Sequence, residues 1–209
     1  MKILLIGNGK VNKTITELYS NLVVGFIDNT EENIKETPNI IIDFSHPSLL
    51  DKTIELALKY RCPVLIGTTG YSEEKMAQIK ELSNKLPLLI SCNFSQGILL
   101  IKKIILDNNN SFNSYNKTII ERHNSLKKDS PSGTALMLEE IFKSNNIHSY
   151  REPFFIGEHE IILENSDEII TISHKVLNRN VFASGAIKAA YWLLNQDVGL
   201  YKLEDTIDE

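Results

Sequence analysis

Short apolar runs alternate with segments of helical spacing through residue 95, and this alternation limits the possible folds more than any other feature. The runs are continuously apolar, which is typical of strands buried on both faces of a sheet. Strands are predicted at residues 2–6, 22–27, 39–44, 63–66 and 86–90. Helices are predicted between them at residues 11–19, at residues 48–60 and after the N-cap residue Ser72. We therefore expect an α/β fold with a doubly wound parallel sheet.

The first of these units has the pattern of a dinucleotide-binding site. Gly7 and Gly9 follow the first strand, and Asp28 ends the second strand about twenty residues later, as in a Rossmann-like domain. The glycines let a pyrophosphate approach the start of a helix, and the acid can accept hydrogen bonds from ribose hydroxyls. The third glycine of the pattern is absent, with Asn12 and Lys13 in its place, which suggests a slightly wider strand–helix contact. An ordinary βα turn remains the alternative for this segment alone.

Polar residues follow three further strands of the predicted sheet. In such sheets, ligands bind beyond the carboxyl ends of the strands, which meet at one edge. These strand ends are therefore predicted to form one cofactor crevice with Gly7 and Gly9. The strand-end residues concerned are Ser45, Gly67, Thr68, Thr69, Ser91, Cys92, Asn93 and Phe94.

The alternation stops after residue 95, which predicts a second domain. A helix is expected at residues 97–106, a strand at 116–121, and a hairpin from the runs 154–163 and 168–176. This order predicts a smaller α+β domain with a mixed or antiparallel sheet at residues 96–179. A last helix at 182–194 has small residues on one face, suited to packing on the first domain, which comprises residues 1–95 and 180–209. The acidic end at 204–209 is expected to be solvated.

The stretch from residue 119 to residue 138 holds the candidate chemistry of the second domain. Ser132 is a good N-cap for a helix, and Gly133 and Thr134 would offer backbone N–H groups to an anion at its start. A candidate proton donor and two cations precede it: His123, Lys127 and Lys128. A solvated loop that leads into a capped helix is the alternative. Combined with the cofactor crevice, the stretch predicts hydride transfer to a small substrate that carries carboxylate or phosphate.

Composition excludes several classes of function. The 209 residues include 42% hydrophobic and 23% charged residues, which is ordinary for a globular protein with an ample core. A formal net charge of −5 without a basic run argues against nucleic acid as a partner. No apolar stretch is long enough to cross a bilayer, and the N-terminus lacks the features of a signal peptide. We therefore expect a cytoplasmic protein without a membrane partner.

The cysteines and the remaining histidines carry weaker expectations. Cys62 and Cys92 are expected to be reduced, buried thiols. His46 could face the cofactor crevice, while His148 and His159 are expected at the surface or in the hairpin. His174 could point at the substrate or into the structure. No metal-ligand cluster emerges, so no metal is expected.

The segment ERHNSLKKDSPSGTA resembles the signature E-x-H-H-x-x-K-x-D-A-P-S-G-T-A of the dihydrodipicolinate reductase family, now called 4-hydroxy-tetrahydrodipicolinate reductases. The strand ends DFSHP, GTTGYS and SCNFSQG are similar to those of the family and occur in the same order. Downstream, IGEHEI, ISHKVLNRNVFASGAIKAA and the closing WLL also resemble it. The similarity covers essentially the whole chain.

This resemblance implies a cytoplasmic homotetramer in diaminopimelate and lysine biosynthesis. It would reduce 4-hydroxy-tetrahydrodipicolinate, a small cyclic dicarboxylate, to tetrahydrodipicolinate with loss of water, using NADH or NADPH. His123 would be the general acid, and Lys127 a second proton donor that also holds the substrate. The substrate site would further include Asn124, Ser132, Gly133, Thr134 and Arg179. The cofactor site would include Gly7, Asn8, Gly9, Lys10, Val11, Asp28, Gly67, Thr68, Thr69, Ser91, Cys92, Asn93 and Phe94. The second domain would bind substrate and mediate oligomerisation.

Three departures from the family pattern affect these expectations. Asn124 replaces the second histidine of the signature and cannot carry a charge. Asn29 follows Asp28 where an arginine commonly grips a 2′-phosphate, which favours NADH, although Lys10 or Lys35 could supply charge. The segment 151–156 has Pro153 and Phe154 where the family tends to have glycine and an acid. Alternative functions are a catalytically impaired nucleotide- or metabolite-sensing homologue, suggested by Asn124, and a reductase of another small cyclic imine.

Overall fold

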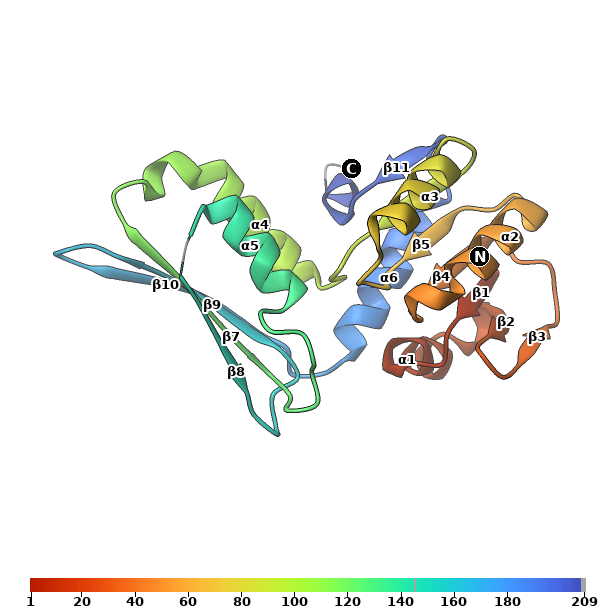
Figure 1. Ribbon diagram of the computed structural model, residues 1–209, viewed down its shortest axis with the longest axis horizontal. Helices are drawn as coiled ribbons and strands as arrows, with labels where there is room; N and C mark the ends of the chain where they lie inside the picture. The colour runs from red at the N-terminus through yellow and green to blue at the C-terminus, as the bar shows by residue number, and fades with distance from the viewer. Residues whose placement is uncertain (145, 208–209) are drawn as a thin grey trace. The chain divides into compact units, whose positions relative to one another are not determined.

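The alternating segments of the first 95 residues form one parallel sheet in the computed structural model, which describes residues 1–144 and 146–207. The chain divides into two units (Figure 1). Unit 1 comprises Met1–Phe94 and the C-terminal segment from Phe182, and unit 2 comprises Ser95–Val181. These divisions lie close to the boundaries predicted after residues 95 and 179.

The sheet of unit 1 has seven strands in the order β11-β6-β5-β4-β1-β2-β3. All five predicted strands are present: β1 (Ile3–Ile6), β2 (Val23–Ile27), β4 (Ile40–Asp43), β5 (Val64–Ile66) and β6 (Pro87–Ile90). The edge strand β3 (Glu32–Ile34) is antiparallel to β2, and the other edge strand, β11 (Gly199–Tyr201), is parallel to β6. Both edge strands were missed because each is only three residues long and lacks a continuous apolar run. The predicted doubly wound α/β architecture is confirmed.

The helices of unit 1 cover a core made by the parallel strands. They are α1 (Lys10–Leu18), η1 (Ser20–Leu22), η2 (Pro47–Leu49), α2 (Leu50–Tyr60), α3 (Glu73–Ser83), α6 (Asn180–Leu193) and η4 (Leu203–Thr206). Ser72 caps α3 as predicted, since its Oγ accepts from the backbone N–H of Lys75. The side chains of Leu4, Ile41 and Ile66 are fully buried, which explains why the strand sequences are continuously apolar.

The small face of α6 packs within unit 1, as predicted. Ala183, Gly185, Ala186 and Ala190 are buried. A Cβ atom on Gly185 would lie 1.8 Å from the carbonyl oxygen of Phe94, so only glycine allows this close approach.

The expectation of a solvated acidic end at residues 204–209 holds for Asp205, which is exposed, but not for Thr206. Leu203 and Thr206 are 3% and 8% exposed, and they anchor η4 on unit 1. The sequence does not predict this burial, because two buried side chains three residues apart are too short a pattern to recognise in an acidic segment. Residues 208 and 209 lie outside the described residues.

Unit 2 is a mixed sheet of four strands with helices on one face (Figure 1). Its strands, in the order β10-β9-β7-β8, are β7 (Asn116–His123), β8 (Ile147–Arg151), β9 (Glu158–Glu164) and β10 (Ile169–Lys175). Its helices are α4 (Gln96–Asn108), η3 (Asn109–Phe112) and α5 (Gly133–Phe142). The buried side chains of Ile105, Ile119, Leu138, Phe142 and Ile161 form the core between sheet and helices.

The predicted mixed sheet and hairpin are confirmed, with two differences. β8 was missed because it is short and alternates with polar residues, and it pairs in parallel with β7. The first hairpin strand starts at Glu158, not at residue 154, because Pro153 and Phe154 lie in the preceding turn. Phe154 is 95% exposed.

Two further observations bear on the sequence expectations. Within residues 1–144 and 146–207, no helix is long and apolar enough to cross a membrane. Cys62 is buried as expected, and burial raises the pKa of its thiol to about 12. The expectation is wrong for Cys92, which is exposed because the loop after β6 carries its side chain outward.

Candidate functional site

A cavity of about 340 Å³ lies in unit 1 at the carboxyl ends of β1, β2 and β4. It brings together the glycine turn, the end of the second strand and the predicted strand-end residue Ser45. His46, for which the crevice was one expected location, also lines it. The lining residues are Gly7, Asn8, Gly9, Asp28, Asn29, Thr30, Phe44, Ser45, His46 and Leu49.

The glycine turn has the shape that a pyrophosphate requires. Gly7 has a φ of +95°, and a Cβ atom there would lie 2.7 Å from the carbonyl oxygen of Phe44. Helix α1 starts directly after Gly9, which caps it without a side-chain hydrogen bond, and Lys10 and Val11 form its first turn. Asn12, at the position of the missing third glycine, donates its Nδ2 hydrogens to the carbonyls of Ile6 and Gly7 at 2.7 and 2.8 Å. The amide thus ties the turn to the helix.

Asp28 is held in a defined position at the cavity wall. Its Oδ1 accepts from the backbone N–H and hydroxyl of Thr30, at 2.8 and 2.7 Å, and from the N–H of Glu31 at 2.9 Å. The bonds from Thr30 and Glu31 hold the pKa of this carboxyl below its usual value. Since these three bonds use Oδ1, the carboxylate can still accept from a ligand through Oδ2.

The other predicted strand-end residues are not among the residues that line this cavity. Gly67 and Phe94 both support the ring of Phe44: a Cβ atom on Gly67 would lie 2.0 Å from the ring, and the two phenyl centroids are 5.3 Å apart. Thr68 is buried beneath the loops. Ser91 donates its hydroxyl to the carbonyl of Asn93 at 2.8 Å, which shapes that loop. Thr69 and Cys92 are exposed.

A buried acid that the sequence analysis missed joins these loops. Asp43, at the end of β4, is fully buried and accepts from the hydroxyls of Ser45, Thr53 and Thr68 at 2.5, 2.8 and 2.7 Å. Burial raises its pKa, against the effect of these hydrogen bonds. An acid at the end of a fully apolar strand was the available signal.

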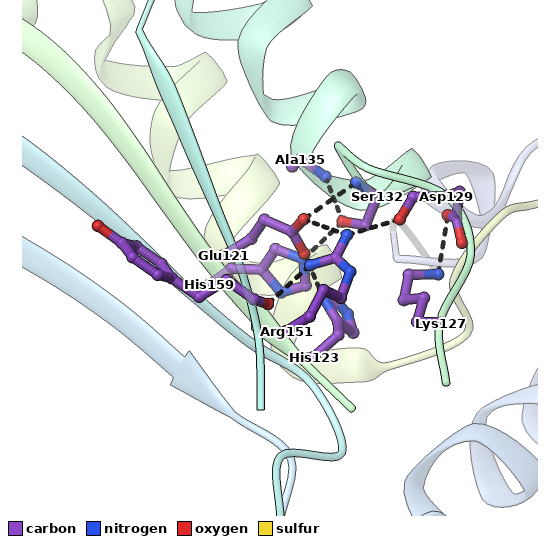
Figure 2. A network of polar contacts seen from close by, with 9 residues as sticks. Glu121, His123, Lys127, Asp129, Ser132, Ala135, Arg151 and His159 are labelled. Atoms are coloured by element: carbon purple, nitrogen blue, oxygen red, sulfur yellow. Dashed lines mark hydrogen bonds and ion pairs between the residues drawn. The ribbon is translucent and has the colours of Figure 1, made fainter. Parts of the chain in front are cut away.

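In unit 2, polar side chains converge on the carboxylate of Glu121 (Figure 2). Glu121 is fully buried. Its Oε2 is hydrogen-bonded to Nδ1 of His123, and its Oε1 accepts from Nη2 of Arg151 at 2.8 Å and from the N–H of Ser132 at 3.3 Å. The predicted acid His123 is therefore paired with a carboxylate.

The sheet and helix α5 bring these groups together. Glu121 and His123 are two residues apart on β7 and so point to the same face. His159 is directly opposite Glu121 on β9. Ser132 caps α5, with its Oγ accepting from the N–H of Ala135 at 3.2 Å, and the same Oγ lies 3.2 Å from Nε2 of His159. The start of α5 is thereby fixed over the carboxylate.

The electrostatics of the network follow from burial and charge. Burial alone would raise the pKa of Glu121, but hydrogen bonds from Arg151 and Ser149 and nearby positive charge hold the pKa below its usual value. Burial lowers the pKa of His123, and the adjacent Glu121 opposes this effect. Burial and the neighbouring His123 lower the pKa of His159 to about 3, so His159 is neutral at neutral pH.

The other predicted substrate residues lie around this network. Lys127 pairs with Asp129, with Nζ 2.8 Å from Oδ2, and its side chain is 29% exposed. Asn124 holds its own loop, since its Nδ2 donates to the carbonyl of Pro153 and its Oδ1 accepts from the N–H of Leu126. Gly133 and Thr134 form the first turn of α5. Arg179, half-buried, directly precedes α6.

Sequence reasoning missed Glu121, Arg151 and the role of His159. Of the two expected places for His159, the hairpin is confirmed and the surface is not: it lies on β9 and is 3% exposed, because its face of the sheet is covered by α5. Strand alternation around Glu121 could have placed it with His123, whereas Arg151 lies on the strand that was missed. His148 is exposed as expected. His174 is half-buried, with Nε2 3.1 Å from Oγ of Ser95.

Glu121, His123 and His159 also place their candidate metal-ligating atoms within 4.8 Å of one another. Both oxygens of Glu121 already accept hydrogen bonds, and the guanidinium of Arg151 lies 2.8 Å from Oε1. A fixed positive charge at that distance opposes a metal cation. The arrangement therefore suits a hydrogen-bonded acid pair better than a metal site.

Family models match nearly all of the chain. One described as dihydrodipicolinate reductase, C-terminus, matches residues 97–207. One described as dihydrodipicolinate reductase, N-terminus, matches residues 19–94. The glycine turn and α1 lie before residue 19, where the N-terminal match begins. The geometry of the cavity therefore supports a dinucleotide site independently of the family models.

Individual relatives and solved structures agree with these models. The chain is 37% identical to 4-hydroxy-tetrahydrodipicolinate reductase of Thermosipho africanus, over 96% of the chain and 94% of the relative. It is 32% identical to the protein of that name from Caldanaerobacter subterraneus, over 96% and 95%. A dipicolinate-bound dihydrodipicolinate reductase from Paenisporosarcina sp. TG-14 superposes with a TM-score of 0.77 at 22% identity, covering 98% and 99% of the two chains. At that identity the structural likeness shows the fold.

The buried state of His159 predicts a pH-dependent stability. Its pKa is about 3 in the folded protein and 6.5 ordinarily, so between these values only the unfolded chain binds the proton. The free energy of unfolding should be fully retained above pH 6.5 and fall below it, by up to about 1.4 kcal/mol per pH unit from this group. Urea denaturation of the wild type and of His159→Gln at several pH values measures this slope.

The variant should show a shallower decline than the wild type below pH 6.5. His148→Gln, which replaces an exposed histidine of the same unit, should keep the wild-type slope. Equal slopes for wild type and His159→Gln would show that His159 is not held neutral in the folded protein.

Proposed function

We propose that this chain, which belongs to the dihydrodipicolinate reductase family, reduces 4-hydroxy-tetrahydrodipicolinate to tetrahydrodipicolinate with loss of water. It is an oxidoreductase of diaminopimelate and lysine biosynthesis that uses a pyridine nucleotide. In the proposed reaction one hydride and one proton enter the substrate and one water leaves. The protein must therefore supply an acid and bind two carboxylates.

The observation that carries the proposal is the pairing of His123 with buried Glu121 beside the start of α5. The pair provides a protonatable group next to a helix start that favours anions. Lys127 adds a positive charge on the adjoining loop. A small acidic substrate that needs a proton fits this combination of charges.

The predicted substrate residues are assigned the following roles. His123 acts as the general acid, and Lys127 is the second proton donor and holds a carboxylate of the substrate. Gly133 and Thr134 present the first backbone N–H groups of α5 to a carboxylate, and Ser132, whose own N–H donates to Glu121, caps this helix start. Asn124 and Arg179 complete the proposed site. Because Asn124 also maintains the loop between β7 and α5, its replacement of histidine is compatible with activity.

The residues of unit 1 fit a pyridine dinucleotide. The positive φ of Gly7 and the uncapped start of α1 leave space and N–H groups for a pyrophosphate, and Asp28 is placed to accept from ribose hydroxyls. When bound, the reduced nicotinamide supplies the hydride. We propose that the strand-end residues Gly67–Thr69 and Ser91–Phe94 shape the rest of this site.

The charges around the cavity support a preference for NADH over NADPH. Asp28 would repel a 2′-phosphate, and Glu31 and Glu32 line an adjoining cavity of about 370 Å³. Lys52 also lines it, but its Nζ lies 3.3 Å from Oε2 of Glu32, which offsets its charge. Lys10 and Lys35, the candidate phosphate partners, line neither cavity.

We further propose a cytoplasmic homotetramer without nucleic-acid or membrane partners. The net charge of −5 disfavours nucleic acid. The sheet of unit 2 has a face opposite its helices, formed in part by Thr118, Ile120, Tyr150 and Ile162. Tyr150 is 46% exposed. Apolar and aromatic side chains on such a face are typical of subunit contacts, and the proposed partners are further copies of this chain.

Lys127→Ala should abolish most of the activity. Loss of a proton donor and substrate cation should lower kcat/KM about 10²- to 10⁴-fold. Oxidation of NADH in the presence of freshly made 4-hydroxy-tetrahydrodipicolinate measures it. Lys128→Ala removes the adjacent exposed lysine and should leave the activity nearly unchanged.

The same assay separates the alternative functions. Equal activity of wild type and Lys127→Ala would show that Lys127 does not have the proposed role. Tight NADH binding without turnover would indicate a sensing protein. Turnover with another cyclic imine, but not with this substrate, would indicate a different reductase.

Asp28→Asn should shift cofactor preference. The amide can keep the Oδ1 bonds to Thr30 and Glu31 but loses the charge that repels a 2′-phosphate. The ratio of kcat/KM with NADPH to kcat/KM with NADH should rise about tenfold, or about 1.4 kcal/mol. Glu36→Gln, which removes an exposed carboxylate elsewhere in unit 1, should leave the ratio unchanged. A ratio that stays constant in Asp28→Asn would show that Asp28 does not select the cofactor.

Ile162→Lys should weaken the proposed assembly. Ile162 lies between Thr118 and Thr171 on the outer face of the sheet, so a lysine there would place repeated positive charges in the contact. Light scattering should report a tetramer for wild type and smaller species for the variant, with circular dichroism unchanged. Lys59→Glu, on α2 of unit 1, is the control. A monomeric wild type at working concentration would contradict the proposal.

A further inference from the structure

The carboxylate of Glu121 is fixed by bonds that do not involve His123. Arg151 of β8 donates to its Oε1, and so does the backbone N–H of Ser132 at the start of α5. The side chain of Glu121 is fully buried, and that of Arg151 is 18% exposed. The position of the Glu121 carboxylate is therefore fixed by β8 and by the start of α5, in addition to its own strand.

This fixed carboxylate determines which ring nitrogen of His123 carries the proton. An ionised carboxylate can only accept, so Nδ1 of His123 must be the donor in their hydrogen bond. The neutral ring then carries its proton on Nδ1 and has its acceptor at Nε2. On that side lies Gly157: a Cβ atom there would be 3.2 Å from Nε2. Gly157 itself therefore adds no side chain over Nε2.

The charged and titratable groups that face His123 come from four segments. Glu121 on β7 is the negative group, while Arg151 on β8 and Lys127 on the following loop are positive. His159 on β9 packs edge to face against the ring, with centroids 5.1 Å apart, and is neutral. Burial and the two cations disfavour a second proton on His123. Within the described residues that act on it, only Glu121 favours that proton.

We propose that Glu121 is a positioning residue that holds His123 by Nδ1, so that His123 takes up and releases its working proton at Nε2. The proposal rests on the proposed function only in taking His123 as the acid. In the reaction, the imidazolium gives its Nε2 proton to the leaving hydroxyl, which departs as water. Nδ1 keeps its proton against Glu121, and Nε2 is reprotonated from solvent.

Glu121→Gln tests this role because it keeps the size of the side chain and removes its charge. Long-range ¹H–¹⁵N correlation spectra of ¹⁵N-labelled protein, assigned with a His123→Asn variant, report the tautomer and titration of His123. In wild type the neutral ring should carry its proton on Nδ1. In Glu121→Gln the tautomer should become mixed or reversed, and the titration midpoint should move to lower pH by about one pH unit or more.

Kinetics give the second measurement. In Glu121→Gln, kcat should fall about 10²-fold at neutral pH with little change in KM. The loss of activity on raising the pH should begin at lower pH than in wild type, because the protonated acid is then less populated. Glu121→Asp, which restores the charge, should recover part of both the midpoint and kcat. Glu140→Gln, an exposed carboxylate on α5, should match wild type.

The outcomes distinguish this proposal from the proposed function. An unchanged tautomer and midpoint in Glu121→Gln would overturn the positioning role, whatever the activity. The expected spectra without turnover in wild type would sustain the positioning role and reject the reaction. If Glu121→Gln does not fold, the spectra of the wild type decide, since a neutral His123 ring that carries its proton on Nε2 would also overturn the role.

Discussion

A carboxylate buried at the end of a strand is the constraint on which both units depend. An ionised acid in the interior is costly unless several donors satisfy it, and here the donors come from different elements. In unit 1, Asp43 gathers hydroxyls from the loop after its own strand, from α2 and from the loop after β5. In unit 2, Glu121 gathers a guanidinium, a helix start and an imidazole. Each acid thereby sets the positions of loops that the apolar core alone would leave undefined.

These two anchors have different relations to the chemistry. Asp43 does not line the cavity, but it accepts a hydrogen bond from Ser45 and so fixes that residue at the cavity wall. Glu121 contacts His123 directly, and the two side chains form an ion pair when His123 is protonated. Ser132 connects the helix start to the same cluster, because its hydroxyl serves both the cap of α5 and His159. The proposed anion binding and the proposed acid chemistry consequently depend on the same few hydrogen bonds.

The sequence was sufficient for the architecture and for the residues that occur in recognisable patterns. Continuous apolar runs predicted every central strand, and the family resemblance, confirmed by the family models, named His123 and Lys127. What escaped prediction depends on pairing between distant strands. Arg151, thirty positions after Glu121 in the sequence, reaches it only because β8 pairs with β7. His159 is buried only because α5 covers its face, and periodicity within one strand does not report such cover.

The return of the chain to unit 1 has a consequence for biosynthesis on the ribosome. Unit 2 is an insertion between Phe94 and Phe182, so all of its strands are synthesised before α6 and β11 exist. Until α6 emerges, the backbone at Phe94 that Gly185 packs against lacks its cover, and β6 is an unprotected sheet edge. The nascent chain can therefore complete unit 2 first, while unit 1 is complete only after α6 and β11 have been synthesised.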